Sequence, residues 1–248
     1  MSTPLISIIT VTYNAQSTLP PTMESVASQS FTDYEHLIVD GASNDRTLSL
    51  AIDLATERTR ITSERDQGIY DAMNRGMGLS RGEYLIFLNA GDSFHSSDTL
   101  QHIADAINEN NKPGMVYGQT ILVGSDRQVT GERHLKAPSR LTLQSFADGM
   151  LVCHQAMTVL KRITSPYDLQ YRFSSDYDWS IRCLQHSRHN VYIDETVIDY
   201  LDEGVTTRNH KASLKERFKI MCHYYGTIPT IARHFKFAAR DIKRKIHK

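Results

Sequence analysis

The sequence predicts an α/β protein with a mostly parallel central sheet, helices on both faces of that sheet, and a helical extension at the C-terminal end. Two observations lead to this class. Apolar segments rich in β-branched residues alternate with amphipathic segments across residues 5–107. The segment 5–11 is almost continuously apolar, as is typical of a parallel strand covered by helices on both sides.

Each strand expected in the first half is followed by an expected helix. The strands are predicted at 5–11, 35–40, 60–63 and 83–88. The helices are predicted at about 17–29, after a cap at Asp45, at 68–79, and from Ser97 onward. Their apolar residues recur with a period near 3.6, as in Leu48, Ala51, Ile52 and Ala55. Helical crossovers between strands predict parallel pairing with right-handed connections.

The pattern changes after residue 112. Segments 115–123 and 128–134 flank a turn sequence and predict a hairpin, and an apolar segment follows at 150–160. Ser174 or Ser175 can cap a helix that carries Tyr177, Ile181 and Leu184 on one face, and a strand is expected at 191–194. Beyond Asn209 the chain is expected to be helical, with an interruption near Gly226 and Pro229. No linker clearly divides two domains.

Composition narrows the class of protein. The 248 residues are 40% hydrophobic and 23% charged, as in ordinary globular proteins, and 28 basic residues balance 28 acidic ones, so nucleic-acid binding is not expected. The longest apolar stretches fall short of the roughly 18 residues of a membrane-spanning helix. The N-terminus is expected to form a strand rather than a signal peptide. Three cysteines without a CxxC pair suit the cytoplasm and favour neither disulfides nor a zinc ribbon.

Three predicted strands end in polar residues. The segments are Val11-Thr12-Tyr13-Asn14, Asp40 to Asp45, and Asn89-Ala90-Gly91-Asp92. The carboxyl ends of parallel strands share one edge, where open α/β sheets bind ligands, so these side chains are expected to converge. Each segment alone is also compatible with a plain turn. No GxGxxG or GxxxxGK[ST] follows the first strand, which argues against a dinucleotide site and a P-loop.

Four separated motifs occur in an order that resembles family 2 glycosyltransferases. They are DQGIYDAMNRG at 66–76, FLNAGD at 87–92, HQA at 154–156 and SSDY at 174–177, and they accompany PLISIITVTYN and VDGASNDRT. The likeness covers about residues 4–205 and is greatest to the branch that assembles bacterial exopolysaccharides, the colanic-acid type. It implies a GT-A-like fold, which contains a Rossmann-like sheet.

The resemblance implies a site for a nucleotide-diphosphate sugar. Its expected lining residues come from the strand ends, the helix after residue 68 and the HQA motif. They are Val11, Tyr13, Asn14, Asp40, Asp66, Asp71, Asn74, Asn89, Ala90, Gly91, His154 and Gln155. A carboxylate such as that of Asp40 can accept a hydrogen bond from an N–H group of the base. A single histidine, however, is more often a core or surface residue, so a structural role is the alternative for His154.

The family normally neutralises the diphosphate leaving group with a divalent metal held by a DxD motif. This sequence departs from the commonest form, D-x-D-D, because Asn89 and Gly91 replace two of the carboxylates. Asp92 remains as the candidate ligand of Mg²⁺ or Mn²⁺, which can be bound by one carboxylate together with phosphate oxygens and water. Metal dependence is therefore less secure than in relatives with the full motif.

The acceptor hydroxyl needs a general base, and the resemblance assigns this role to Asp176 of the SSDY motif. The alternative is structural, because a carboxylate in a first helical turn is favoured by the helix dipole in any case. Asp178, two residues later, is expected to face away or to complete a cap.

Residues 233–248 contain seven Lys or Arg residues and one acidic residue, Asp241. Phe235, Ala238, Ala239, Ile242 and Ile246 fit one helical face opposite the charges. This basic tail is either a solvated terminal helix or a segment that lies on an anionic membrane surface.

The resemblance implies an inverting, hexosyltransferase-like enzyme that transfers a sugar to a lipid-linked saccharide acceptor in bacterial surface-polysaccharide synthesis. Residues 1–208 are expected to form the catalytic domain, with a nucleotide-binding half (about 1–112) and an acceptor half (113–208), followed by the tail 209–248. The expected location is the cytoplasm, peripheral on the inner face of the membrane. The alternatives are a nucleotide-sugar-binding scaffold without turnover and a nucleotidyltransferase of similar fold, although the Gly-rich N-terminal loop usual in the latter is missing.

Overall fold

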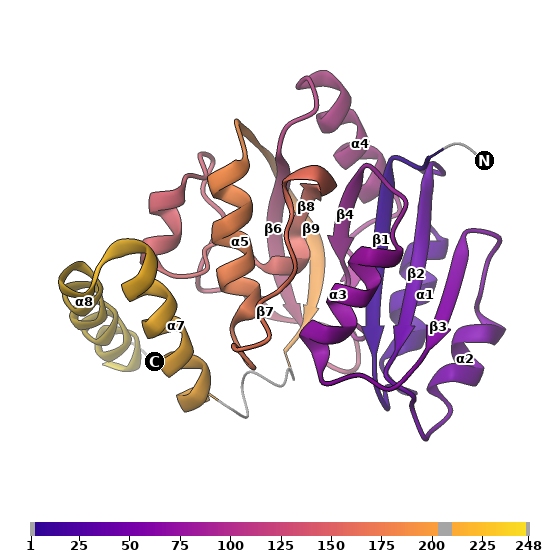
Figure 1. Ribbon diagram of the computed structural model, residues 1–248, viewed down its shortest axis with the longest axis horizontal. Helices are drawn as coiled ribbons and strands as arrows, with labels where there is room; N and C mark the ends of the chain where they lie inside the picture. Colours follow the sequence, from indigo (N-terminus) through magenta and orange to yellow (C-terminus); the bar gives the residue numbers. More distant parts are fainter. Residues whose placement is uncertain (1–2, 203–209, 247–248) are drawn as a thin grey trace.

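A computed structural model of the protein describes residues 3–202 and 210–246. Within them the chain forms one mixed, curled sheet flanked by helices (Figure 1). Its strands are β1 (Ile6–Thr12), β2 (Tyr34–Asp40), β3 (Thr59–Ser63), β4 (Tyr84–Phe87), β5 (Ser93–Phe94), β6 (Met115–Val123), β7 (Val129–Glu132), β8 (Met157–Leu160) and β9 (Asn190–Leu201). The hydrogen-bonded order is β3-β2-β1-β4-β8-β6-β9-β5, and β7 pairs with β6.

The helices follow the expected order along the chain. They are α1 (Leu19–Ala27), α2 (Thr47–Asp53), α3 (Ile69–Leu79), α4 (Thr99–Glu109), α5 (Ser175–His186), α7 (His210–Tyr225) and α8 (Thr227–Ile246). Three 3₁₀ turns, η1 (Leu143–Asp148), η2 (His154–Ala156) and η3 (Lys161–Ile163), lie in the second half. Figure 1 shows α3 and α5 in front of the sheet and α1 behind it.

The first four strands confirm the predicted parallel arrangement. β1 pairs in parallel with β2 and β4, and β2 pairs in parallel with β3. All seven residues of β1 and of β2 are buried, which explains the nearly continuous apolar sequence of β1. In β2 three of the buried residues are polar or charged: Glu35, His36 and Asp40. Because β4 returns to the far side of β1, α3 crosses the opposite face of the sheet from α1.

Tight packing holds α3 against this part of the sheet. A Cβ atom added at Gly76 of α3 would lie 2.5 Å from Cγ2 of Ile9 in β1 and 3.2 Å from Cγ2 of Val39 in β2. The glycine therefore allows the helix backbone to approach the sheet more closely than any larger residue would.

The second half departs from a mostly parallel sheet. β8 pairs antiparallel with both β4 and β6, and so joins the two halves of the sheet. The sequence showed only an apolar segment here, because neither partner strand is close in the chain. β9 is also longer than the predicted strand at 191–194: it continues through Asp194 and Glu195, where register shifts beside Gln119 of β6 accommodate the polar residues.

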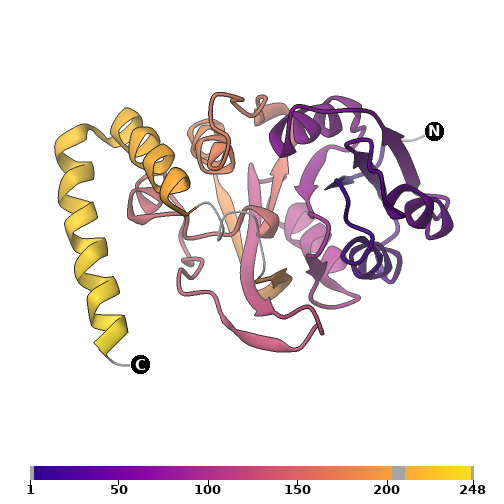
Figure 2. The same cartoon turned by 90° about the horizontal axis from the view of Figure 1, so that it is seen from below.

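The C-terminal helices pack at one end of the molecule. Gly226, with φ of +86°, forms the expected break between α7 and α8. Figure 2 shows α7 beside α5 and α8 on the outer side of α7. None of the helices that the structure describes is long and apolar enough to cross a membrane.

Candidate functional site

The carboxyl ends of β1 and β2 meet the turn before α3 at one edge of the sheet. The name recess is used for the place where three residues of this edge meet, Tyr13, Gly41 and Asp66. A Cβ atom added at Gly41 would lie 2.5 Å from Oδ2 of Asp66 and 3.3 Å from Cδ2 of Tyr13, so these residues converge as predicted. The Tyr13 side chain is 59% exposed, which leaves its ring open for stacking. Val11, by contrast, is buried within β1. The recess therefore offers an aromatic face and a carboxylate beside a glycine.

The loop after β1 is tied to the loop after β2. Asn14, which has a left-handed backbone with φ of +49°, accepts a hydrogen bond from the Asn44 N–H at 2.9 Å. Its own N–H donates to Ser43 Oγ at 2.9 Å, and the Gln16 N–H donates to Asp45 Oδ2 at 3.2 Å. Asn14 thus shapes the rim of the recess, because its amide oxygen is engaged by the backbone.

Asp40 is fully buried between β2 and β3. Its carboxylate accepts hydrogen bonds from the Ser43 N–H at 3.0 Å, from the Ser43 hydroxyl, and from the Ser63 hydroxyl at 2.6 Å. These contacts link the ends of two strands and leave Asp66 better placed than Asp40 to meet a base. The predicted contact between Asp40 and the nucleoside stays a prediction.

Two predicted residues of α3 make contacts that build the site's framework. Asp71 accepts a hydrogen bond from the Gln67 N–H at 2.9 Å and so closes the turn before the helix. The Asn74 side chain donates to the Tyr167 carbonyl at 3.0 Å and accepts from the Tyr167 N–H at 2.6 Å. Asn74 therefore fastens the segment before α5 to α3.

The loop after β4 contains unsatisfied polar atoms. Asn89 Oδ1 and Thr12 Oγ1, at the ends of neighbouring strands, are buried and have no hydrogen-bond partner among the described residues. Buried polar atoms normally have partners, so their presence here indicates a ligand or water. Ala90 packs against the apolar cluster of α1, and the Gly91 carbonyl accepts a hydrogen bond from Arg127 at 2.6 Å.

Asp92 lies deeper than the rest of this loop, with 4% of its surface exposed. Its Oδ2 accepts a hydrogen bond from Gln155 Nε2 at 2.9 Å, and its Oδ1 accepts one from the Leu201 N–H at 3.0 Å. Burial raises the pKa of Asp92 to about 7, and these two bonds act in the opposite direction. The carboxylate therefore joins the β4–β5 loop to η2 and to the end of β9.

These residues do not fit a metal centre in this arrangement. Both oxygens of Asp92 are engaged by protein donors, and the replacements at Asn89 and Gly91 remove the neighbouring carboxylates. Across residues 3–202 and 210–246, no group of three or more His, Cys, Asp or Glu side chains is arranged to hold a metal ion. The assignment of Asp92 as a metal ligand stays a prediction that this geometry does not support.

His154 lies in an aromatic cluster beneath the site. Its ring stacks on Phe87 with centroids 5.2 Å apart, and its Nε2 is 2.5 Å from the Tyr167 hydroxyl. Trp179 stacks on Tyr167, with centroids 5.1 Å apart. Burial lowers the pKa of His154 to about 4, so the ring is neutral at pH 7. His154 is therefore a neutral, buried residue whose contacts with Phe87 and Tyr167 pack the core next to the site.

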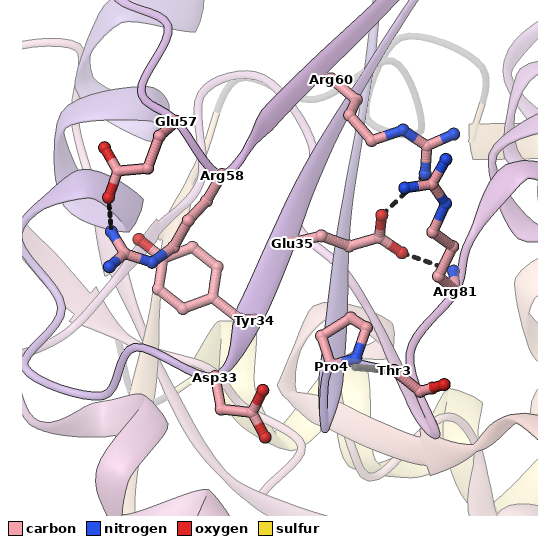
Figure 3. A pocket seen from close by; sticks show the side chains of 9 residues that line it. All are labelled: Thr3, Pro4, Asp33, Tyr34, Glu35, Glu57, Arg58, Arg60 and Arg81. Carbon is pink, nitrogen blue, oxygen red and sulfur yellow. Dashed lines mark hydrogen bonds and ion pairs between the residues drawn. The ribbon is translucent and has the colours of Figure 1, made fainter. Parts of the chain in front are cut away.

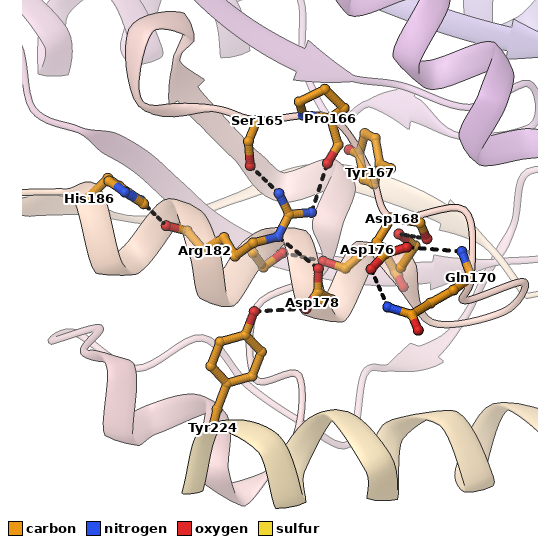
Figure 4. A network of polar contacts seen from close by, with 12 residues as sticks. Ser165, Pro166, Tyr167, Asp168, Gln170, Asp176, Asp178, Arg182, His186 and Tyr224 are labelled. Carbon is orange, nitrogen blue, oxygen red and sulfur yellow. Dashed lines mark hydrogen bonds and ion pairs between the residues drawn. The ribbon is translucent and has the colours of Figure 1, made fainter.

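Asp176 and Asp178 occupy the first turn of α5 but have different surroundings. Asp176 is partly exposed, and its Oδ1 accepts a hydrogen bond from the Tyr70 hydroxyl at 3.0 Å. Asp178 is buried, forms an ion pair with Arg182 at 2.8 Å, and accepts a hydrogen bond from the Tyr224 hydroxyl at 2.8 Å (Figure 4). Asp178 is therefore engaged by Arg182 and Tyr224, in line with the expectation that it faces away, and Asp176 is the more exposed of the two carboxylates.

Two cavities lie away from the donor loops. One, of about 660 Å³, is at the amino ends of β2 and β3, where Glu35 accepts hydrogen bonds from Arg60 and from the Arg81 N–H (Figure 3). The other, of about 600 Å³, borders Asp178 and Tyr224 on the α7 side of α5. Neither occupies the edge where Tyr13 and Asp66 meet.

The sequence did not indicate the roles of Tyr70 and Arg127. Tyr70 is within the quoted motif at 66–76, but its partner Asp176 is over a hundred residues away. Arg127 was part of a predicted hairpin turn, and the structure shows that this turn reaches Gly91 and Ser93. No local signal gives either contact, because both depend on how the sheet brings distant loops together.

Comparisons with known proteins agree with this arrangement. A family model described as Glycosyl transferase family 2 matches residues 7–164. A PGL/p-HBAD biosynthesis glycosyltransferase of Mycobacterium tuberculosis is 38% identical over 192 residues, which cover 75% of this chain and 72% of the relative.

Two solved structures are also similar. TarS of S. aureus in complex with UDP-GlcNAc has a TM-score of 0.70 at 16% identity, over 94% of this chain and 73% of that one. A mannosyltransferase of Pyrobaculum calidifontis in complex with GDP-Man and Mn²⁺ has a TM-score of 0.59 at 15% identity, over 95% and 75% of the two chains. At these identities the two structures are evidence for the fold.

Proposed function

Because the chain belongs to glycosyltransferase family 2 and has a GT-A-like fold, we propose a specific reaction for it. The enzyme transfers a sugar from a nucleotide-diphosphate donor to a saccharide hydroxyl and inverts the anomeric centre. The observation that carries the proposal is the segment 66–70. Asp66 borders the recess of Tyr13 and Gly41, and Tyr70, four residues later in the first turn of α3, donates a hydrogen bond to Asp176. One short segment therefore links the proposed donor recess to the proposed base.

The donor's nucleoside is proposed to bind at the recess. The exposed Tyr13 ring can stack on a base, and the Asp66 carboxylate can accept a hydrogen bond from a base N–H. Asn89 Oδ1 and Thr12 Oγ1 then gain partners from the ribose or the sugar. Two similar structures are complexes with UDP-GlcNAc and with GDP-Man, which supports a nucleotide sugar as the donor here.

Asp176 is proposed to act as the general base. Its Oδ1 is held by Tyr70, and among the described residues no side chain donates to its Oδ2. This oxygen can accept the proton of the acceptor hydroxyl as that hydroxyl attacks the anomeric carbon and the bond to the nucleoside diphosphate breaks. A single displacement of this kind inverts the anomeric centre.

A divalent metal such as Mg²⁺ or Mn²⁺ would supply charge neutralisation at the leaving diphosphate. It remains a prediction from the family, supported by the Mn²⁺ named for one similar structure. Because the residues around Asp92 do not fit such an ion, the proposed mechanism assigns no step to it.

The acceptor is proposed to be a lipid-linked saccharide in the synthesis of a cell-surface glycan. The name of the mycobacterial relative, which refers to PGL biosynthesis, supports this class. We assign residues 1–208 to catalysis, with 1–112 binding the nucleotide and 113–208 the acceptor. Within the helical tail 209–248, we assign residues 233–248 to membrane contact on the cytoplasmic side. The basic composition of residues 233–248 supports that last assignment.

The deciding experiment compares Asp176→Asn with Asp178→Asn. Donors are first chosen by thermal stabilisation with UDP-, GDP- and dTDP-sugars, since a ligand at 100 times its Kd adds about 2.7 kcal/mol. Asp176→Asn should slow donor hydrolysis or transfer by about 10²–10⁴-fold and leave donor affinity nearly unchanged. Asp178→Asn should lower stability but keep most turnover per folded molecule.

The outcomes separate the alternatives. Donor binding by the parent protein without any turnover would favour a scaffold over an enzyme. A fully active Asp176→Asn protein would reject Asp176 as the base, and loss of turnover in Asp178→Asn alone would assign the base to Asp178.

A further inference from the structure

One face of α7 packs against the start of α5. Ser213, Arg217 and Ile220 recur at helical spacing and lie on the same side of the helix. Ser213 Oγ is 3.0 Å from Ser174 Oγ at the N-cap of α5, and Ile220 is fully buried. Arg217 lies between these two contacts along the helix, so its side chain leaves α7 on the face directed toward α5.

The residue before Arg217 fixes this orientation. The Glu216 carboxylate accepts hydrogen bonds from the N–H groups of Arg172 at 3.0 Å and Phe173 at 2.8 Å. Both of its oxygens are therefore engaged in holding the segment that leads into Asp176. Glu216 is for that reason not the partner of the neighbouring Arg217.

Among the residues that the structure describes, one donor of Arg217 has no hydrogen-bond partner. Its Nε is buried and has no hydrogen-bond partner among residues 3–202 and 210–246, and no ion pair within these residues includes Arg217. A buried guanidinium donor without an acceptor is unfavourable, because the group has lost water without gaining a replacement. An anion bound at this point would supply the acceptor and the opposite charge.

The packing of α7 directs Arg217 toward the first turn of α5, which contains the proposed base Asp176. Burial raises the pKa of Tyr70 well above its ordinary value, Asp176 raises it further, and the positive charge of Arg217 acts against both. Arg217 therefore acts electrostatically on the same tyrosine that donates a hydrogen bond to Asp176.

We propose that Arg217 forms an anion subsite for the acceptor, so that the acceptor carries a phosphate or carboxylate close to the hydroxyl that reacts. The inference rests on the proposed function, in which the base and the leaving diphosphate lie on opposite faces of the transferred sugar. A cation beside the base is then on the acceptor side. The planar guanidinium suits a phosphate or carboxylate, since it can donate two parallel hydrogen bonds to either.

The test uses three probes with the full-length protein saturated with its best nucleotide sugar: glucose 1-phosphate, glucuronic acid and methyl glucoside. Each is assayed as a transfer acceptor and as an inhibitor of donor hydrolysis. The parent protein should favour an anionic probe over methyl glucoside by about tenfold or more, because charge-assisted hydrogen bonds are roughly twice as strong as neutral ones. The two anionic probes distinguish a phosphate from a carboxylate.

Arg217→Gln should bring the three probes to within about twofold of one another, while KM for the donor stays unchanged. Arg217→Lys, which keeps the charge but not the planar fork, should retain part of the preference. Lys219→Gln removes an exposed charge from the same helix and should behave like the parent. A merely structural role would weaken all probes and donor hydrolysis equally, and Arg217→Lys would not restore discrimination.

Two results would overturn the inference. One is a parent protein that ranks the three probes alike while hydrolysing donor. The other is an Arg217→Gln protein that keeps the anionic preference but loses affinity for the nucleoside diphosphate, which would place Arg217 at the leaving group. Failure of the parent to bind or hydrolyse any nucleotide sugar would instead reject the proposed function itself.

Discussion

Asp92 shows at the scale of one residue how a recognisable motif position can acquire a structural role. The motif suggested a metal ligand, but the carboxylate satisfies one donor from η2 and one from the end of β9. Losing either bond would loosen the loop that carries Asn89 and Gly91. Asp92 therefore contributes to the site through the position of its neighbours.

Asp92→Asn should destabilise the protein even without metal or nucleotide. Asparagine has one carbonyl oxygen, so either the Gln155 amide or the Leu201 N–H loses its acceptor and is left buried. The expected loss in free energy of unfolding is about 1–3 kcal/mol, measured by urea denaturation in the presence of a chelator. Unchanged stability with chelator, combined with a loss only when Mn²⁺ is added, would instead favour a metal-ligating role.

His36 gives a residue-scale prediction for acid stability. It is fully buried in β2 beside Thr10, 2.9 Å from Nε2 to Oγ1, and burial lowers its pKa to about 3. In the unfolded chain the His36 ring takes up a proton near pH 6.5, whereas in the folded chain it does not. The contribution of His36 to the free energy of unfolding is therefore fully present above pH 6.5. It is lost as the pH falls toward 3, by up to about 1.4 kcal/mol per pH unit.

A His36→Gln variant should show a shallower fall in unfolding free energy between pH 6 and pH 4 than the parent. His154 changes the unfolding free energy with pH in the same direction as His36, and Asp92, with its raised pKa, changes it in the opposite direction. Both contributions are the same in the two proteins, so the difference between their pH profiles reports His36. Parallel pH profiles for the two proteins would show that His36 does not titrate in this way.

At the scale of elements, α3 joins the two halves of the site. The turn before it carries Asp66 at the recess, Tyr70 donates a hydrogen bond to Asp176, and Asn74 holds the backbone of Tyr167. The position of the helix on the sheet therefore sets the distance between the proposed donor site and base. Gly76 determines that position through its contact with Ile9.

Gly76→Ala and Gly78→Ala form a matched pair on α3. An added Cβ at Gly76 meets Ile9 and Val39, so the variant should lose about 1–3 kcal/mol of unfolding free energy and some turnover. An added Cβ at Gly78 meets nothing within 4 Å, and alanine should add about 0.5–1 kcal/mol there. Chemical denaturation measures both effects, and equal changes in the two variants would contradict tight packing at Gly76.

At the scale of the whole molecule, α8 combines basic composition with exposed apolar side chains. Ile228 is 82% exposed and Phe235 is 75% exposed, and their spacing of seven residues places them on one side of the helix. Arg233 lies 3.7 Å from Asp148, which connects the helix to η1. An amphipathic basic helix at one end of the molecule is suited to an anionic membrane surface.

The protein is therefore predicted to co-sediment with vesicles that contain anionic lipid and to be released by added salt. The Debye length, the distance over which exposed charges interact, is about 8 Å at physiological ionic strength. Vesicle binding should therefore fall steeply as the salt concentration rises. Deleting residues 233–248 should reduce vesicle binding and leave nucleotide-sugar affinity intact. Phe235→Ser tests the apolar contribution separately. Binding insensitive to salt and to the deletion would leave α8 an ordinary terminal helix.

The sequence by itself determined the elements with strong local signals. The nearly continuous apolar composition of β1, the apolar periodicity of α4 and the glycine break at Gly226 each result from neighbouring residues, and the structure agrees with them. The order of four short motifs was likewise enough to predict the family and the fold, which the comparisons confirm.

Tertiary structure alone decided which carboxylates are open to ligands and which are engaged. Asp40, Asp92 and Asp178 are buried by partners from distant segments, whereas Asp66 and Asp176 retain exposed surface. The insertion of β8 between β4 and β6 likewise depends on pairing between strands far apart in the chain. A residue's type and spacing specify the chemistry it is capable of, but its availability depends on burial and hydrogen-bond partners that only the folded chain brings to it.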